Sequence, residues 1–195
     1  MLAPFPVSLN LEGRRCVVIG DDAEADQKEN ALRESGATVE RVHNAGEVDE
    51  TQLRDAFFVI STPQDAQLSA RLRKLAEAHR FLLCCIDQPA YGFVSMAAIA
   101  KAGPVRIAIS TAGFAPRVGK LMKNALQKAL DETFERFISC QAALKRRNRK
   151  RFPQSSSKRR EAMIAAARGF GLDLVLHYPQ WFDDEERARL PHLVE

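Results

Sequence analysis

The chain has 195 residues, of which 46% are hydrophobic and 28% charged, a balance typical of a globular protein with a sizeable core. No apolar run approaches the roughly 18 residues of a membrane-spanning helix, and the first residues lack the basic and apolar regions of a signal peptide. These absences argue against a membrane partner, and we expect a cytoplasmic protein. The four cysteines show no metal-binding spacing and are expected to be reduced thiols.

The positive charge is concentrated in one segment. The net charge is +4, but nine Lys or Arg residues and no acid lie between Lys145 and Arg160, so the remainder carries −5 (4 − 9). Such a run can bind a polyanion, including nucleic acid, or form a solvated helix face. Phe152 is the one aromatic residue close to it, which argues against nucleic acid as the partner.

Apolar runs of strand length alternate with helical stretches along the first half of the chain. Strands are predicted at 14–19, 37–42, 57–61 and 81–86, helices at 22–35 and 65–79, and a short helix or connector at 48–56. The runs at 16–19 and 57–61 are apolar on both faces, as in a parallel sheet covered by helices. Residues 1–103 are therefore predicted to form a Rossmann-like, doubly wound α/β domain.

The pattern changes after this domain. Residues 105–110 alternate as a strand, and one long helix is predicted from Pro116, with an apolar stripe that continues through Ile138. A helix with one apolar face packs on another subunit or on another layer of the same chain. Residues 151–195 are expected to form a helical tail. Its helices are predicted at 158–169 and from 179 or 183 to 190.

The stretch Cys16–Lys28 has the layout of a dinucleotide site, because a buried strand turns at Gly20 into a helix. Asp21 and Asp22 follow, however, where a pyrophosphate needs small residues and uncovered backbone N–H groups. At ~5 Å and an effective dielectric of about 20, each like-charge pair costs roughly 3 kcal/mol before discounting for exposure. Asp21 or Asp22 can also cap the helix. We therefore expect NAD to bind weakly or not at all.

Several stretches resemble one known family. Residues 104–116, Pro-Val-Arg-Ile-Ala-Ile-Ser-Thr-Ala-Gly-Phe-Ala-Pro, match its most specific motif, and Cys16–Lys28 and Leu83–Asp87 occupy the places of two others. The chain is similar over essentially its whole length to the precorrin-2 dehydrogenase/sirohydrochlorin ferrochelatase family, the dehydrogenase part of siroheme synthase. Members oxidise precorrin-2 with NAD to sirohydrochlorin, and some then insert iron. They are homodimers in which the segment that matches 104–150 holds the partner, so the resemblance implies that 104–150 is a dimerisation segment.

The resemblance implies a set of site residues. Gly20, Asp21, Asp22, Lys28 and Thr62 would lie at the cofactor; Asp87 would be the catalytic residue and handle the metal; Ser110, Thr111 and Gly113 would contact the tetrapyrrole. Fe²⁺ or Co²⁺ would be the chelation substrate.

Other readings of these residues stay open. Asp87 could be an ordinary loop acid, and Ser110 and Thr111 could cap the helix that begins near Pro116. Departures from the family pattern gather around the cofactor cleft, at Glu24, Gln27, Pro63, Gln64, Ser69 and Cys84. We hypothesise an enzyme of siroheme biosynthesis that dehydrogenates precorrin-2, inserts a divalent metal into sirohydrochlorin, or does both, with the NAD-dependent step in doubt. The alternatives are a non-catalytic tetrapyrrole-binding paralogue and, third, a nucleic-acid binder that uses the 145–160 run.

Overall fold

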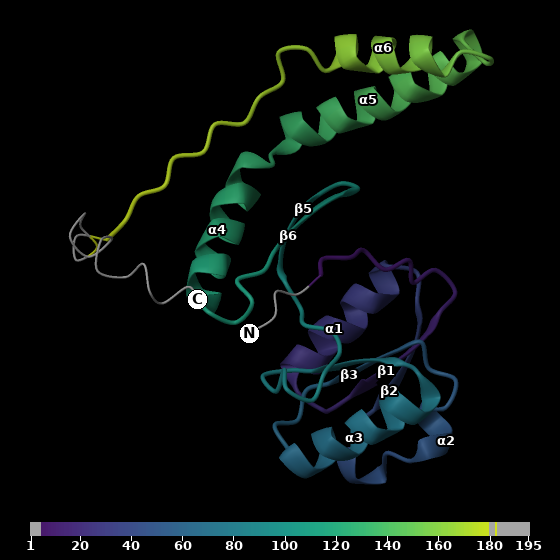
Figure 1. Cartoon of the computed structure of the whole chain (residues 1–195), viewed down its shortest axis with the longest axis vertical. Coiled ribbons are helices and arrows are strands. Elements are labelled where there is room, and N and C mark those ends of the chain that lie inside the picture. The colour runs from purple at the N-terminus through teal and green to yellow at the C-terminus, as the bar shows by residue number, and fades with distance from the viewer. Residues whose placement is uncertain (1–4, 180–181, 183–195) are drawn as a thin grey trace. The chain divides into compact units, whose positions relative to one another are not determined.

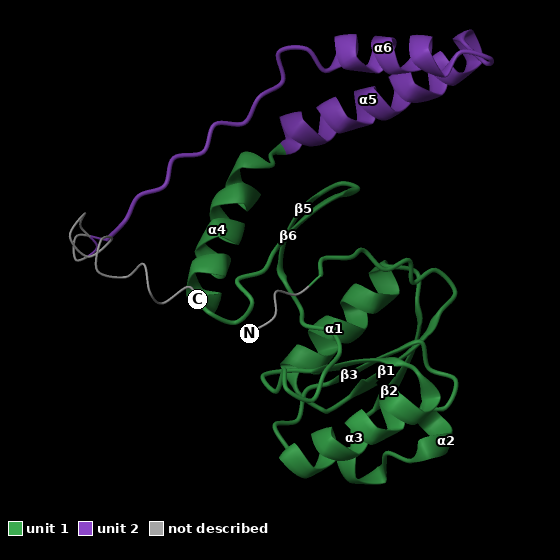
Figure 2. Cartoon of the chain, in the orientation of Figure 1, with its two compact units in different colours: residues 1–131 green, residues 132–195 purple. Residues whose placement is uncertain are grey.

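A computed structural model of the chain describes residues 5–179 and residue 182. The chain divides into two compact units, Met1–Asp131 and Glu132–Glu195 (Figure 2). These units do not coincide with the three segments expected from the sequence, whose boundaries were placed at 103 and 150. In the described residues, no helix is long and apolar enough to cross a membrane.

The first unit contains the predicted parallel sheet, with strand order β2-β1-β3-β4. Its strands are β1 (Arg15–Ile19), β2 (Thr38–Val42), β3 (Phe58–Ser61) and β4 (Leu82–Cys85). Its helices are α1 (Ala23–Glu34), α2 (Glu50–Leu53) and α3 (Ala66–His79), and a short 3₁₀ turn, η1, covers Ala45–Glu47. Helix α1 covers one face of the sheet, and α2 and α3 cover the other (Figure 1). The Rossmann-like prediction for this part is confirmed.

The alternation of side chains along β1 explains why both faces are covered. Val17 and Ile19 pack into the cluster on the side of α2 and α3, whereas Cys16 and Val18 pack into the cluster on the side of α1. All four side chains are fully buried. Because burying a side chain of this size contributes about 1.5–3 kcal/mol, the central strand is held firmly and fixes the position of the turn that follows it.

The strand predicted at 105–110 forms a β-hairpin with a preceding strand that the sequence did not reveal. The two strands are β5 (Ala98–Ala102) and β6 (Val105–Ile109), which pair antiparallel. The predicted boundary at 103 falls in the turn of this hairpin, where Gly103 has a φ of 51°. Strand β5 reads Ala-Ile-Ala-Lys-Ala, and the low strand propensity of Ala and Lys concealed it.

The hairpin is joined to helix α4 (Pro116–Ala129) by one side chain. The Gln127 amide donates to the Lys101 carbonyl at 2.9 Å and accepts from the Lys101 N–H at 3.0 Å. These two bonds replace a neighbouring strand at the edge of β5.

The prediction of a single long helix from Pro116 through Ile138 is wrong. Helix α4 ends at Ala129, and α5 begins at Glu132 and continues to Arg151. Between them Leu130 leaves helical geometry, with φ −89° and ψ 70°. Asp131 precedes α5, a position that favours aspartate, and acidic Glu132 lies in the first turn, so the sequence restarts the helix here.

The second unit pairs α5 with α6 (Ser156–Ala166). The Gln141 amide donates to the Ala166 carbonyl at 2.7 Å, and the rings of Phe137 and Phe170 stack with centroids 5.1 Å apart. Helix α6 confirms the helix predicted at 158–169 in place, with bounds shifted by two to three residues. The last predicted helix, up to residue 190, lies almost entirely outside the described residues.

Candidate functional site

Gly20 forms the turn between β1 and α1, and only glycine fits there. Its φ is 132°, and a Cβ built on it would lie 2.2 Å from Thr62 Oγ1. The Gly20 N–H donates to the Val42 carbonyl at 2.9 Å. The close approach brings the end of β1 against the residue that follows β3, so the structure places Gly20 and Thr62 together at the carboxyl edge of the sheet.

The Asp22 carboxylate occupies the N-terminus of α1. Its Oδ1 accepts the Ala25 backbone N–H at 2.7 Å, and its Oδ2 accepts the Thr62 hydroxyl at 2.8 Å. The bond from Ala25, then that from Thr62, holds the pKa of the Asp22 carboxyl below its usual value, because both donors stabilise the charged form. The expectation that Asp21 or Asp22 caps the helix is met by Asp22.

A pyrophosphate does not fit this turn as the residues stand. The backbone donors that a phosphate uses at a helix N-terminus are directed at the Asp22 carboxylate, which is itself negative. Asp21 lies beside it, 2.7 Å from His43 Nδ1, with both side chains exposed. Lys28, the cation nearest in sequence, lies 3.2 Å from Glu24. The predicted cofactor residues are therefore engaged with one another or with neighbouring side chains.

Arg41 is a buried residue of this edge that the sequence reasoning missed. Its side chain is 7% exposed, and its Nε donates to the Gly20 carbonyl at 2.6 Å. Its two terminal nitrogens lie 3.1 Å from Glu29 and 3.2 Å from Asp26. Arg41 thus holds the turn through the Gly20 carbonyl and links it to α1 through Glu29 and Asp26. The strand reads Thr-Val-Glu-Arg-Val, and with Glu40 beside it nothing in this run marks Arg41 as buried.

Asp87 lies just beyond β4, at the same edge of the sheet. Its side chain is exposed, and its φ of 57° is in the left-handed region, which aspartate tolerates better than most residues. The neighbouring backbone fixes the turn, because Gln88 N–H donates to the Cys85 carbonyl at 3.2 Å and Ile86 N–H to the Ser61 carbonyl at 2.9 Å. The Gln64 amide donates to Asp87 Oδ2 at 3.1 Å and orients the carboxylate.

The turn at 110–113 carries the predicted substrate-contacting residues. Ser110 Oγ accepts the Ala112 N–H at 3.2 Å, and Thr111 Oγ1 accepts the Ala115 N–H at 3.3 Å. Ala115 is the N-cap of α4, and its side chain cannot accept a hydrogen bond. The Thr111 hydroxyl instead satisfies one backbone N–H at this end of the helix, that of Ala115. Ala112 and Gly113 both have positive φ, 51° and 84°. The capping alternative thus has support for Thr111, whereas Ser110 bonds within the turn, and each hydroxyl keeps its own proton to donate.

The structure unites some predicted residues and not others. Asp22 and Thr62 are hydrogen-bonded and Gly20 lies against Thr62, while Gln64 links Asp87 to the loop after β3. Among the described residues, no hydrogen bond joins Asp87 to the 110–113 turn. Nor do those residues contain three His, Cys, Asp or Glu side chains grouped as a metal site.

Comparisons with known proteins agree with this architecture. Residues 7–98 match the family model described as putative NAD(P)-binding. Two siroheme synthases, from Xylella fastidiosa (strain M12) and Hahella chejuensis (strain KCTC 2396), are 27% and 25% identical over 177 and 175 residues, which cover 81% and 80% of this chain. The solved structure of SirC, precorrin-2 dehydrogenase, matches with a TM-score of 0.67 at 20% identity, over 83% of this chain and 88% of that one.

The resemblance to the precorrin-2 dehydrogenase family is confirmed. The structural match establishes the Rossmann-like fold that this family shares with the chain. The chain spans 37% of the length of each of the two siroheme synthases, so it corresponds to a part of them.

Replacing Asp22 by Ala should lower the free energy of unfolding by about 1 kcal/mol at pH 7, the usual effect of losing a helix N-cap. Because the folded pKa of Asp22 lies below its unfolded value of about 3.8, its contribution is present above that pH and is lost as pH falls through the folded pKa. Urea denaturation of wild type and D22A between pH 7 and 2.5 measures this difference.

The matched control is D55A, which removes an exposed carboxylate at the opposite edge of the sheet, before β3. A difference between wild type and D22A that stays constant across this pH range would contradict the assignment.

Proposed function

We propose that this chain acts in siroheme biosynthesis and that it inserts a divalent metal, Fe²⁺ or Co²⁺, into sirohydrochlorin. The observation that carries the proposal is Asp87, an exposed carboxylate at the carboxyl edge of the sheet in a constrained left-handed turn. Ligands of open α/β sheets bind at that edge. The relatives named siroheme synthase and precorrin-2 dehydrogenase support the tetrapyrrole as the substrate class.

The position of Asp87 suits metal insertion. When a divalent ion enters a tetrapyrrole, two pyrrole N–H protons must leave, and an accessible carboxylate can accept a proton from the ring. A carboxylate is also a good transient ligand for a divalent cation. The Gln64 amide donates a hydrogen bond to Asp87 Oδ2 at 3.1 Å. This bond orients the carboxylate and leaves Oδ1 to meet a proton or a metal ion. The metal is a substrate here, so a single carboxylate suffices and no resident metal cluster is needed.

The D87N variant tests this proposal. We expect metal insertion into sirohydrochlorin, followed by the change in absorbance after adding Co²⁺, to slow by roughly 100-fold, the lower range for loss of a general base. The substitution keeps the size and one hydrogen-bonding oxygen of the side chain, so tetrapyrrole binding should remain within a few-fold of wild type.

The control variant is D55N, which makes the same chemical change at the other edge of the sheet and should leave the rate unchanged. A wild-type chain that binds sirohydrochlorin but does not accelerate metal insertion would overturn the proposal in favour of a non-catalytic tetrapyrrole-binding paralogue.

We further propose that the chain has low NAD affinity because Asp22 competes for the donors of α1. D22G should raise NAD affinity by about tenfold, since it removes a negative charge and uncovers the N–H groups, while glycine at an N-cap costs only a few tenths of a kcal/mol. Calorimetric titration with NAD measures both proteins.

The D49G variant is the matched control, because Asp49 caps α2 in the same way away from the turn. It should leave NAD affinity unchanged. A micromolar dissociation constant for the wild-type chain would contradict the low affinity.

Finally, we propose that α4 takes part in a homodimer. Val118, Leu121 and Met122 lie on one face of the helix and are 51%, 58% and 41% exposed in the single chain. A hollow of about 610 Å³ lined in part by Leu121 and Ala125 lies on the same helix. L121E should weaken dimerisation by at least tenfold, given the 1.5–3 kcal/mol associated with burying a leucine.

Analytical ultracentrifugation checks this expectation. The control is K120E, which adds an acid on the opposite side of α4 and should leave the dimer intact. A wild-type chain that stays monomeric at about 100 μM would refute the proposal, because its dimer would then be weaker than about 5–6 kcal/mol.

A further inference from the structure

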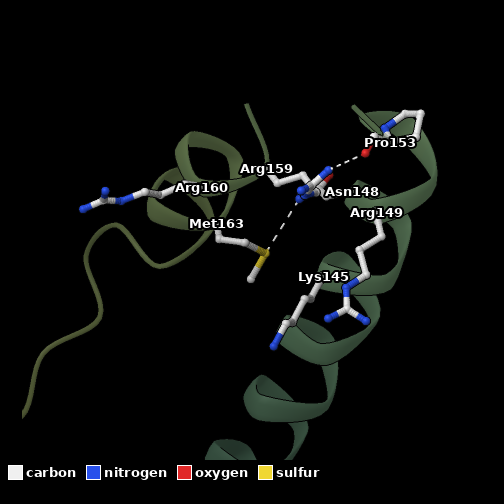
Figure 3. Close-up of a pocket in the computed structure, with 7 residues that line it drawn as sticks. All are labelled: Lys145, Asn148, Arg149, Pro153, Arg159, Arg160 and Met163. Carbon is white, nitrogen blue, oxygen red and sulfur yellow. Dashed lines mark hydrogen bonds between the residues drawn. The ribbon is translucent and has the colours of Figure 1, made fainter. Parts of the chain in front are cut away.

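A basic hollow lies between α5 and α6 in the second unit. Its volume is about 530 Å³, within the range of small-molecule sites. Four of its lining side chains are cations, Lys145, Arg149, Arg159 and Arg160, and none is acidic (Figure 3). All the residues that line the hollow belong to this unit.

Lys145 and Arg149 are the cations available to a ligand. They lie one helical turn apart on the same face of α5, and both line the hollow (Figure 3). Both are exposed, and within the described part of the chain neither forms an ion pair. Arg160 extends away from them in the same view. Two neighbouring like charges without an acid raise the local positive potential, which an anion would relieve.

Arg159 and Asn148 form the fixed wall of the hollow. The Arg159 guanidinium donates to the carbonyls of Phe152 and Pro153 at 2.6 and 2.8 Å, so its charge is held in place at the turn between the helices. The buried Asn148 amide donates to Met163 Sδ at 3.7 Å (Figure 3). A thioether is a weak acceptor, so this buried donor is poorly satisfied and would gain from an anionic oxygen.

We propose that this hollow binds a small polyanion, a molecule that carries two or more carboxylate or phosphate groups. One anionic group would pair with Lys145 and Arg149, and a second would face the guanidinium of Arg159. A bounded hollow between two helices favours a small ligand over nucleic acid. Phe152, the aromatic residue near the run, lies under the Arg151 guanidinium at 5.1 Å and is half-buried, so it offers no base-stacking face. This proposal does not depend on the proposed enzymatic function.

Calorimetric titration of the full chain at low salt with citrate, a tricarboxylate, and with tripolyphosphate tests the site. We expect one of the two to bind with one-to-one stoichiometry, and their relative affinities tell a carboxylate ligand from a phosphate one. The K145Q/R149Q variant should lose at least tenfold in affinity. Both residues are exposed on α5, so the variant should keep the wild-type circular dichroism spectrum.

The matched control is R147Q/K150Q, which removes the same two charges from the opposite face of α5 and should change affinity by less than threefold. Absence of binding to both anions at millimolar concentration would overturn the proposal. So would an equal loss in the two variants, which would indicate a diffuse basic surface. Tighter binding of a single-stranded 12-mer DNA, weakened equally by both pairs of substitutions, would instead assign the run to nucleic acid.

Discussion

The Asp22 carboxylate ties three parts of the chain together at the carboxyl edge of the sheet. It caps α1 through Ala25, accepts the Thr62 hydroxyl from the loop after β3, and lies beside Gly20 at the end of β1. The close approach of Gly20 to Thr62 makes this bond possible, because any Cβ at position 20 would displace the hydroxyl. The geometry that would normally admit a phosphate therefore serves an internal carboxylate.

Arg41 completes this arrangement by binding the outside of the same turn. Its Nε donates to the Gly20 carbonyl, and its other nitrogens face Glu29 and Asp26 of α1. A buried guanidinium needs such partners, since an unpaired charge in this position would be costly. The turn is thus fixed from both sides: a carboxylate takes the helix donors, and a guanidinium takes the strand carbonyl. A substitution at Gly20, Asp22 or Arg41 would therefore disturb the contacts of the other two.

The sequence predicted the parallel sheet and its helices because the strands are apolar on both faces and Asp22 and Gly36 mark the ends of α1. It failed at β5, where alanines give no strand signal, and at Leu130, where an apolar stripe continues through a break in the helix. The cap by Asp22 was predictable because it is local. The contact of Arg41 with Gly20 was not, because it joins residues 21 positions apart through the folded sheet.

The acids at the edge of the sheet act on two ligands in opposite senses. Asp21, Asp22 and Glu24 add negative charge where a dinucleotide would place its phosphates, and the part of the chain outside 145–160 carries −5. The same negative charge attracts a divalent cation toward Asp87, because a negative field raises the local concentration of cations. Under the proposed function, the substitutions that weaken NAD binding therefore favour the approach of the metal substrate. On this proposal, one group of acids disfavours the NAD step and favours metal insertion.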